Sequence, residues 1–381
     1  MKKSKKLKIL MLNYEFPPLG GGGGVASYKL AKGFVQLGHQ VDVVTTWFKG
    51  LKKVEKREGL NIYRVKVIGR KELPTATTIS LMSYPLMAYK KASDLCKKNK
   101  YLFVNTQFAI PTGPLGVIIS KQFGLKNILS LHGGDIYDPT KNSSPHNKFY
   151  LRETVKWALN NSDFIVAQSS NTRQNAIHYY NPNKEIQIIP LPYEPFKFKK
   201  ISREKLDLKK DLTYLIGVGR LVKRKGFDFF IKTIAEIKDV KVHGLIIGEG
   251  PEKENLISLA KELGVEEQIH FLGFVSEEKK FQYLNNSDIY FLSSVHEGFG
   301  IVLQEAMQVG LPIIATNNGG QIDLIEKGKN GYLIKYGNTK QVQEAIKKII
   351  ENKSQISKNN KQKSKEFELK VIAEKYWGLL K

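Results

Sequence analysis

Two glutamates eight residues apart, Glu297 and Glu305, flank the turn Gly298-Phe299-Gly300 and the start of an apolar run. Asp288 to Ser293 has the pattern of a buried strand, and the residues from Ile301 onward have that of a helix. The first turn of a helix offers backbone N–H groups and the positive end of its dipole, which together can hold a diphosphate. On a helix, two residues eight positions apart point in directions about 80° apart around the axis. The two acids could therefore bind opposite ends of one ligand. An activated sugar, with hydroxyl groups on both sides of a diphosphate, fits such a site.

A group of cations lies where an expected strand, 212–218, meets an expected helix, 227–237. Arg220 follows the strand, and Lys223, Arg224 and Lys225 precede the helix. Arginine and lysine at such a junction suit a diphosphate, although we expect Lys223 and Arg224 to be solvated. The chain contains no Asp-x-Asp triplet, so we expect neither a metal ion nor metal ligands at this site.

The first residues predict a βαβ unit: a strand over 8–13, the glycine run Gly20 to Gly24, a helix over 25–37 and a second strand over 39–46. The glycine loop could approach a phosphate, or it could be a flexible turn. A dinucleotide-binding fold would place an acid at the end of the second strand to hold a ribose. This strand ends in Thr45-Thr46-Trp47 instead, which argues against a nicotinamide enzyme.

Another candidate site follows the strand expected over 127–131, which runs directly into His132-Gly133-Gly134-Asp135. Open α/β sheets place their sites at the carboxyl ends of their strands. We therefore take His132 and Asp135 as candidate site residues.

The rest of the chain alternates strands and helices in both halves, as expected for an α/β protein. Prolines at 190, 192 and 195 make a stiff stretch near the midpoint, which we take as the domain boundary. The expected domains are 1–193, 194–365 and a terminal helix segment, 366–381. Further strands are expected over 60–67 (at a sheet edge), 101–105, 163–167, 187–189, 242–247, 270–275, 312–316 and 331–334, and further helices over 149–160, 342–350 and 367–380, with 353–365 a loop or frayed helix.

The charge is strongly basic: 61 Lys and Arg against 36 Asp and Glu give +25 over 381 residues, and the larger share lies in the first half. One interpretation is an anionic partner, such as lipid headgroups, a polyprenyl phosphate or nucleic acid; the other is a lysine-rich solvated surface. The single cysteine, Cys96, excludes an internal disulfide framework and indicates a reducing compartment.

Residues 79–89 are apolar and aromatic and are followed by five lysines up to position 100. They predict either a core helix with a solvated end or a face that contacts lipid. The N-terminus reads as a basic lead-in to a strand rather than a signal peptide, and no run of 18 apolar residues occurs. We expect a cytoplasmic protein whose membrane contact, if it has one, is peripheral at the inner face.

Several of these patterns resemble signatures of the retaining family-4 (group 1) glycosyltransferases of the GT-B superfamily. The E-x7-E signature of that family, often written E-G-F-G-…-E, matches in full at Glu297, Gly298, Phe299, Gly300 and Glu305. The resemblance implies that Glu297 reaches the donor sugar and Glu305 holds the ribose. The H-G-x-D pattern resembles the motif whose histidine, here His132, contacts the donor sugar. The G-R-L-x-x-x-K-G pattern resembles the phosphate-binding pair, here Arg220 and Lys225.

The same resemblance implies further donor contacts. A P-P-x-G-G loop closes over donor and acceptor, a G-x-G-P turn lies beside the nucleotide, and the backbone after the strand at 270 meets the base. The implied catalytic residues are Glu297, His132, Arg220 and Lys225, and the implied donor-binding residues are Gly22, Gly23, Asp135, Gly248, Phe274, Val275, Gly298, Phe299, Gly300, Ile301, Val302, Leu303 and Glu305.

What the resemblance implies for the whole chain is an α/β, GT-B fold. Two Rossmann-like domains would face an interdomain cleft, the first binding the acceptor and the second the nucleotide sugar, and a C-terminal helix would cross back to the first. The implied function is a retaining, metal-independent glycosyltransferase without a cofactor. It would move a sugar from a UDP or GDP donor to a hydroxyl acceptor, such as a lipid-linked or cell-surface glycan. The alternatives are a GT-B epimerase, a phosphorylase and a non-catalytic polyanion-binding protein; nucleic acid is a weak candidate partner because it leaves the paired glutamates unexplained.

Overall fold

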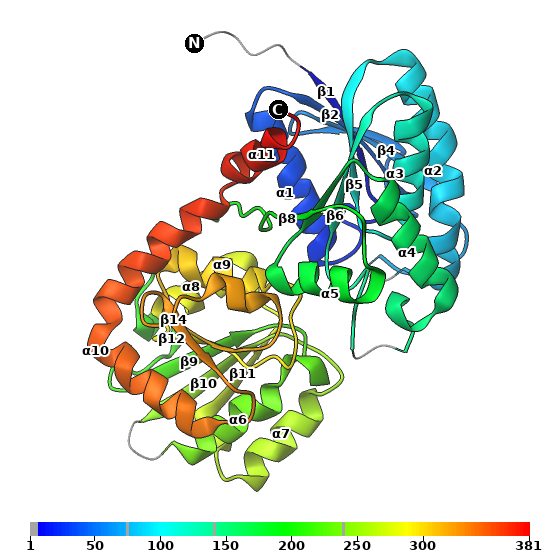
Figure 1. Cartoon of the computed structure of the whole chain (residues 1–381). Helices are drawn as coiled ribbons and strands as arrows, with labels where there is room; N and C mark the ends of the chain where they lie inside the picture. Colours follow the sequence, from blue (N-terminus) through cyan, green and yellow to red (C-terminus); the bar gives the residue numbers. More distant parts are fainter. Residues whose placement is uncertain (1–6, 74–75, 140–141, 238–240) are drawn as a thin grey trace. The chain divides into compact units, whose positions relative to one another are not determined.

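The computed structural model describes residues 7–73, 76–139, 142–237 and 241–381. The chain divides into two compact units, Met1–Glu194 with Phe367–Lys381 and Pro195–Glu366. Each unit is a mainly parallel sheet with helices on both faces (Figure 1). The last helix, α11 (Leu369–Gly378), thus belongs to the first unit, although the chain reaches it through the whole of the second.

The sheet of the first unit has eight strands in the order β3-β4-β2-β1-β5-β6-β7-β8. All neighbours are parallel except β3, which is antiparallel to β4. The prediction of an edge strand near residue 60 is wrong, because β3 forms a hairpin with β4 and covers its outer side. The strands are β1 (Lys8–Leu12), β2 (Gln40–Trp47), β3 (Val54–Arg57), β4 (Leu60–Lys66), β5 (Tyr101–Gln107), β6 (Lys126–Leu131), β7 (Phe164–Ala167) and β8 (Ile186–Ile188).

Alternate residues of the central strand β1 face two separate cores, since successive strand side chains point to opposite faces. Ile9 and Met11 pack with α1 (Gly22–Gln36) and α11, whereas Leu10 and Leu12 pack with α2 (Thr78–Lys98) and α3 (Thr112–Gln122). The latter face is continued by α4 (Phe149–Asn161) and α5 (Ser170–Tyr180). Helices α3 and α5 were not predicted, and α1 begins three residues earlier than expected, inside the glycine run.

The second unit has six parallel strands in the order β11-β10-β9-β12-β13-β14. Its core lies between this sheet and three helices, α6, α7 and α10. The strands are β9 (Thr213–Val218), β10 (Val242–Ile247), β11 (Ile269–Gly273), β12 (Ile289–Leu292), β13 (Ile313–Thr316) and β14 (Gly331–Ile334), and the helices are α6 (Phe227–Glu236), α7 (Lys253–Glu262), α8 (Glu277–Asn286), α9 (Ile301–Val309) and α10 (Thr339–Ser364). Short 3₁₀ helices lie at Pro145–Asn147, Arg203–Leu206, Lys223–Lys225, Glu266–Gln268, Gly320–Leu324 and Lys365–Phe367.

Helix α10 is longer than predicted, since 353–365 was expected to be a loop or frayed helix. It continues to Ser364 with a kink at Asn352, whose φ and ψ are −118° and 17°. The polar second half is held by side chains that the sequence pattern does not identify as buried. Asn360 is fully buried, and its Nδ2 donates to the carbonyls of Leu311 and Asn330 at 3.0 and 2.9 Å.

Among the described residues, no helix is both long enough and apolar enough to span a membrane.

Candidate functional site

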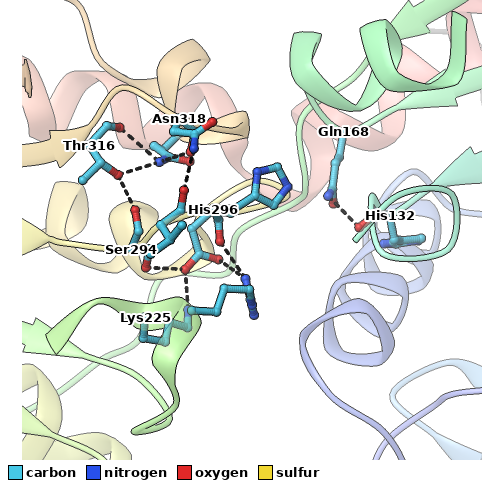
Figure 2. Close-up of polar contacts among 11 residues, drawn as sticks. His132, Gln168, Lys225, Ser294, His296, Thr316 and Asn318 are labelled. Carbon is cyan, nitrogen blue, oxygen red and sulfur yellow. Dashed lines mark hydrogen bonds and ion pairs between the residues drawn. The ribbon is translucent and has the colours of Figure 1, made fainter. Parts of the chain in front are cut away.

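Glu297 lies in the turn between β12 and α9, with its side chain turned inward and the residue only 7% exposed. Oε1 accepts hydrogen bonds from Lys225 Nζ at 2.5 Å and from Ser294 Oγ at 2.7 Å. The guanidinium of Arg224 lies 3.5 Å from Oε2. Lys225 and Ser294 lie close to each other in Figure 2, where dashed lines mark their contacts. The carboxylate therefore has two cations and a hydroxyl as partners.

These cations decide the charge of Glu297. Burial alone raises the pKa of a carboxyl group, because it disfavours the charged form. The positive charges of Lys225 and Arg224, with the hydrogen bonds from Lys225 and Ser294, together outweigh that effect, so the pKa of Glu297 lies below its ordinary value. The acid is consequently ionised at neutral pH and is paired rather than solvated.

Lys225 reaches Glu297 because the segment after β9 folds back on the end of β12. Residues Lys223–Lys225 form a 3₁₀ turn, and Gly226 follows with φ +63°. A β-carbon at Gly226 would lie 2.1 Å from the carbonyl oxygen of Ser293, so this crossing requires glycine. Two hydrogen bonds fix the approach: Val295 N donates to Arg224 O at 2.9 Å, and Ser293 Oγ donates to Lys225 O at 3.2 Å.

The expectation that Arg224 is solvated is wrong. In addition to its contact with Glu297, its guanidinium donates to the carbonyl of His296 at 2.8 Å. Lys223 is exposed, as expected. Arg220 is also exposed, directly after β9, and is not part of the ion pair around Glu297. The structure thus brings Lys225 and Arg224 to Glu297. The prediction that Arg220 and Lys225 bind phosphate is a separate one, which these contacts do not test.

The turn that carries Glu297 is held by hydrogen bonds from the last residue of β13 and from the segment that follows it (Figure 2). Thr316 Oγ1 donates to Ser294 O at 2.6 Å, and Asn318 Nδ2 donates to Val295 O at 2.7 Å. Gly320 N donates to Glu297 O at 2.7 Å. None of these supporting residues was predicted, because their role depends on β12 and β13 being neighbours in the sheet.

The predicted helix start after the glycine turn is correct. Gly300 adopts φ +97° as the N-cap of α9, Phe299 is buried, and Ile301, Val302 and Leu303 form the first turn. Glu305 lies one turn into the helix rather than two. Its Oε1 accepts a hydrogen bond from Lys280 on α8 at 2.9 Å.

The remaining second-unit candidates lie at the ends of neighbouring strands. Gly248 follows β10, and its N–H donates to Gly273 O at the end of β11 at 2.9 Å. Phe274, the next residue, is 87% exposed, and Val275 is half-buried. Among the described residues, no three His, Cys, Asp or Glu side chains are grouped so that they could hold a metal ion.

In the first unit, His132 is held from four directions at the end of β6. Its N–H donates to Asp135 Oδ1 at 2.9 Å, and its carbonyl accepts from Gln168 Nε2 at 2.8 Å (Figure 2). Its ring stacks on Phe108 at 4.2 Å, and Nε2 lies 2.8 Å from Gln107 Oε1. No sequence pattern pointed to Gln107, which ends β5, to Phe108, which follows it, or to Gln168, which follows β7.

Phe108 and the glycine run meet at this histidine. Phe108 adopts φ +74°, which is unusual for a bulky residue and is typical of strained positions at functional sites. A β-carbon at Gly23 would lie 2.4 Å from the Phe108 ring and 3.5 Å from His132 Nδ1. Gly23 and its neighbour Gly22 are in the first turn of α1, so the helix N-terminus approaches the imidazole and leaves no room for a side chain there.

Asp135 connects two loops through its buried carboxylate. Oδ1 accepts from His132 N, and Oδ2 accepts from Ala109 N at 2.6 Å. Burial raises the pKa of Asp135 to about 6, and the backbone hydrogen bonds oppose this rise. The carboxylate is thus used to position backbone, which does not test its predicted contact with a donor.

The hydrogen bonds of Gln107 determine the tautomer of His132. Its Nε2 donates to Asn105 Oδ1 at 2.5 Å and to Ser130 Oγ at 3.2 Å, so its Oε1 faces His132 Nε2. A carbonyl oxygen only accepts, so Nε2 of the histidine carries the proton. Nδ1 is shielded from solvent and has no hydrogen-bond partner among the described residues. Burial lowers the pKa of His132 to about 3.

We predict that His132 stays neutral, with its proton on Nε2, from pH 8 down to pH 5. The physical reason is that protonation would place a charge in a buried site and would add an Nδ1–H that has no acceptor among the described residues. NMR of protein with ¹⁵N-labelled histidine measures both the charge and the tautomer, and the variant His132→Gln assigns the signal. Because the unfolded state binds this proton and the folded state does not, His132 should lower stability as pH falls below ~6.5, by at most about 1.4 kcal/mol per pH unit. A titration midpoint near 6.5 in the folded protein would contradict this prediction.

Comparison with known families covers nearly the whole chain in two parts. Residues 198–367 match the family described as "Glycosyl transferases group 1", and residues 20–195 match "Glycosyltransferase Family 4". The two matched segments correspond closely to the two compact units.

Individual proteins give the same result. The chain is 29% identical over 347 residues to N-acetyl-alpha-D-glucosaminyl L-malate synthase of Bacillus anthracis, which covers 88% of this chain and 85% of that protein. Sucrose-phosphate synthase from Thermosynechococcus elongatus superposes with a TM-score of 0.81 at 20% identity over 98% of both chains. Anabaena HepE in complex with UDP-glucose superposes with a TM-score of 0.74 at 20% identity, over 98% of this chain and 99% of that one.

Proposed function

The chain belongs to the group 1 glycosyltransferases, and from this membership we propose that it is a retaining, metal-independent enzyme that uses a nucleoside-diphosphate sugar. Membership in the family and the GT-B fold confirm the resemblance seen in the sequence. Sugar transfer makes the protein an enzyme, so the non-catalytic alternative is rejected. The donor, the stereochemical outcome and the acceptor are parts of the proposal.

The observation that carries the proposal is the ionised Glu297 beside Lys225, directly before the N-terminus of α9. A donor diphosphate at this helix end would meet backbone N–H groups and the positive end of the dipole. The ammonium of Lys225 has three N–H donors and uses one of them for Glu297. The others are available to phosphate oxygens, so one lysine can bind the diphosphate and the acid together.

Protein cations replace a metal ion in this proposal. Lys225, Arg224 and the exposed Arg220 are three positive groups within six residues of chain. Together with the start of α9 they would stabilise the diphosphate as it leaves, where negative charge grows in the transition state. Each such group that is removed would slow transfer by about 10²–10³, the scale found for donors that stabilise a developing oxyanion.

The transfer itself breaks the bond between the anomeric carbon and the diphosphate oxygen and forms a bond from that carbon to the acceptor oxygen on the same face. The acceptor hydroxyl gives its proton to the leaving diphosphate oxygen, which balances the step without a protein base. Glu297 orients the sugar and balances positive charge at the anomeric carbon. Glu305 holds the ribose, and His132 contacts the donor sugar, as the family resemblance implies.

We further propose a lipid-linked or cell-surface acceptor, with peripheral contact at an anionic membrane. Helix α2 supports this proposal because one of its faces is apolar and exposed: Ile79, Met82, Leu86 and Met87 lie there, Met82 and Leu86 at 67% and 74% exposure. Lysines follow at the C-terminal end of the same helix, from Lys90 to Lys98. An apolar face flanked by lysine fits the boundary of an anionic bilayer.

The proposed function is tested by a thermal-shift panel of UDP and GDP sugars, run in EDTA and again with Mg²⁺. UDP sugars come first, because the related HepE structure contains UDP-glucose. A ligand that binds only the folded state raises the melting temperature, by an amount that grows with concentration. We expect one donor to raise it equally in both buffers. Stabilisation only with Mg²⁺ would contradict metal independence, and conversion of the donor without any acceptor would favour the epimerase alternative.

We predict that Lys225→Met moves the acid limb of the pH–rate profile to higher pH. Lys225 is the largest of the influences that lower the pKa of Glu297, so its removal lets burial raise that pKa, and the active carboxylate is lost at a higher pH. The rate should also fall, by about 10²–10³. Lys223→Met is the matched control, since it removes an exposed cation two residues away and should leave both quantities unchanged. An acid limb that does not move in Lys225→Met would show that Glu297 is not the titrating group.

We predict that the double substitution Met82→Asp and Leu86→Asp reduces sedimentation with phosphatidylglycerol vesicles at least tenfold. Two carboxylates on the exposed face of α2 oppose both the apolar and the electrostatic parts of lipid binding. Ile350→Asp, at an exposed position on α10, controls for added negative charge and should bind as the wild type does. Equal sedimentation of all three proteins would remove the proposed membrane contact.

A further inference from the structure

Lys280 is a buried lysine on the apolar face of α8. It is 8% exposed, and its neighbours on that face, Phe281 and Leu284, are also buried, whereas Lys279 is exposed. Lysine is almost never fully buried unless it is paired. Its position between α8 and α9 therefore calls for an explanation in terms of its partners.

The buried partner of Lys280 is Glu305. Nζ lies 2.9 Å from Glu305 Oε1, and these two side chains are 11% and 13% exposed. The other partner, Glu277, is bound at 3.0 Å through both oxygens, but its side chain is 64% exposed. Burial lowers the pKa of Lys280, but the charges and hydrogen bonds of Glu305 and Glu277 together outweigh this effect and leave that pKa above its ordinary value. The ammonium is thus charged, and its least solvated contact is with Glu305.

Stability alone does not account for this pair. Replacing a buried ion pair by apolar residues of similar size is often neutral or stabilising, and the face of α8 around Lys280 is already apolar. Removing only one partner is different, because it leaves a buried charge without compensation. A lysine at this position is therefore best explained by what it does to Glu305.

We infer that Lys280 is a positioning residue for nucleotide binding, which holds Glu305 in the orientation that meets the ribose hydroxyls of the donor. The inference rests on the proposed function, in which Glu305 binds the ribose. Each carboxylate oxygen can accept about two hydrogen bonds, so Oε1 can bind Lys280 and still share in binding a diol. Without the ammonium, the carboxylate loses the partner that fixes its rotamer between α8 and α9.

The inference predicts a loss of affinity that depends on the ribose hydroxyls. Isothermal calorimetry measures the Kd of UDP and of 2′,3′-dideoxy-UDP for wild type, Lys280→Met and Lys279→Met, with the guanine pair in their place if the panel selects GDP. Lys280→Met should bind UDP about tenfold more weakly, the scale of one hydrogen bond to a charged group, and should bind the dideoxy compound as the wild type does. Lys279→Met removes the same charge one residue away and should change neither.

A second background separates positioning from other effects. In Glu305→Gln, adding Lys280→Met should cost no further affinity for UDP, because the group that Lys280 positions is already altered. Equal losses for UDP and its dideoxy form, or a full loss in the Glu305→Gln background, would overturn the inference. If Glu305→Gln binds UDP as tightly as the wild type, the ribose role within the proposed function fails, and the inference fails with it. If Glu305→Gln binds UDP more weakly than the wild type but Lys280→Met does not, only the inference is overturned. If Lys280→Met does not unfold cooperatively, Lys280→Gln takes its place, because it is a smaller change that keeps an N–H donor. Unchanged binding of dideoxy-UDP verifies that the site is folded.

Discussion

Burying an ionised carboxylate costs free energy unless charges or hydrogen bonds compensate it, and the loops around Glu297 in the second unit meet this requirement. Lys225 and Arg224 supply the charge, and they can do so only because Gly226 lets their segment cross the end of β12. The same turn leads directly into α9, whose N-terminus adds a further positive end. One electrostatic constraint therefore places an acid, two cations and a helix end within one loop cluster.

In the first unit, the buried candidate side chain is a neutral histidine. His132 is surrounded by polar and aromatic neighbours that leave one nitrogen, Nδ1, as a shielded acceptor. Phe108, with its positive φ, and Gly23, which has no side chain, both lie against this ring. In both units the candidate side chains follow the carboxyl ends of parallel strands, which is where an α/β sheet leaves room for a ligand.

Local signals were predictable from the sequence, and pairings across the sheet were not. The glycine turn and the helix start at Ile301 follow from neighbouring residues and are confirmed. The contact between Lys225 and Glu297 joins residues 72 positions apart and depends on β9 and β12 being neighbours. The charge of a side chain does not show which face of an element it occupies. Lys280 is charged but occupies an apolar position, and Arg224 was expected to be solvated because of its charge.

In the proposed mechanism, the protein's own cations bind the diphosphate next to Glu297. A crystal structure with an uncleavable donor analogue, grown in EDTA, tests it directly. We expect phosphate oxygens within about 3 Å of Lys225 Nζ, with the sugar against Glu297. A diphosphate bound away from Lys225, or one that is ordered only when a divalent cation is supplied, would contradict the account.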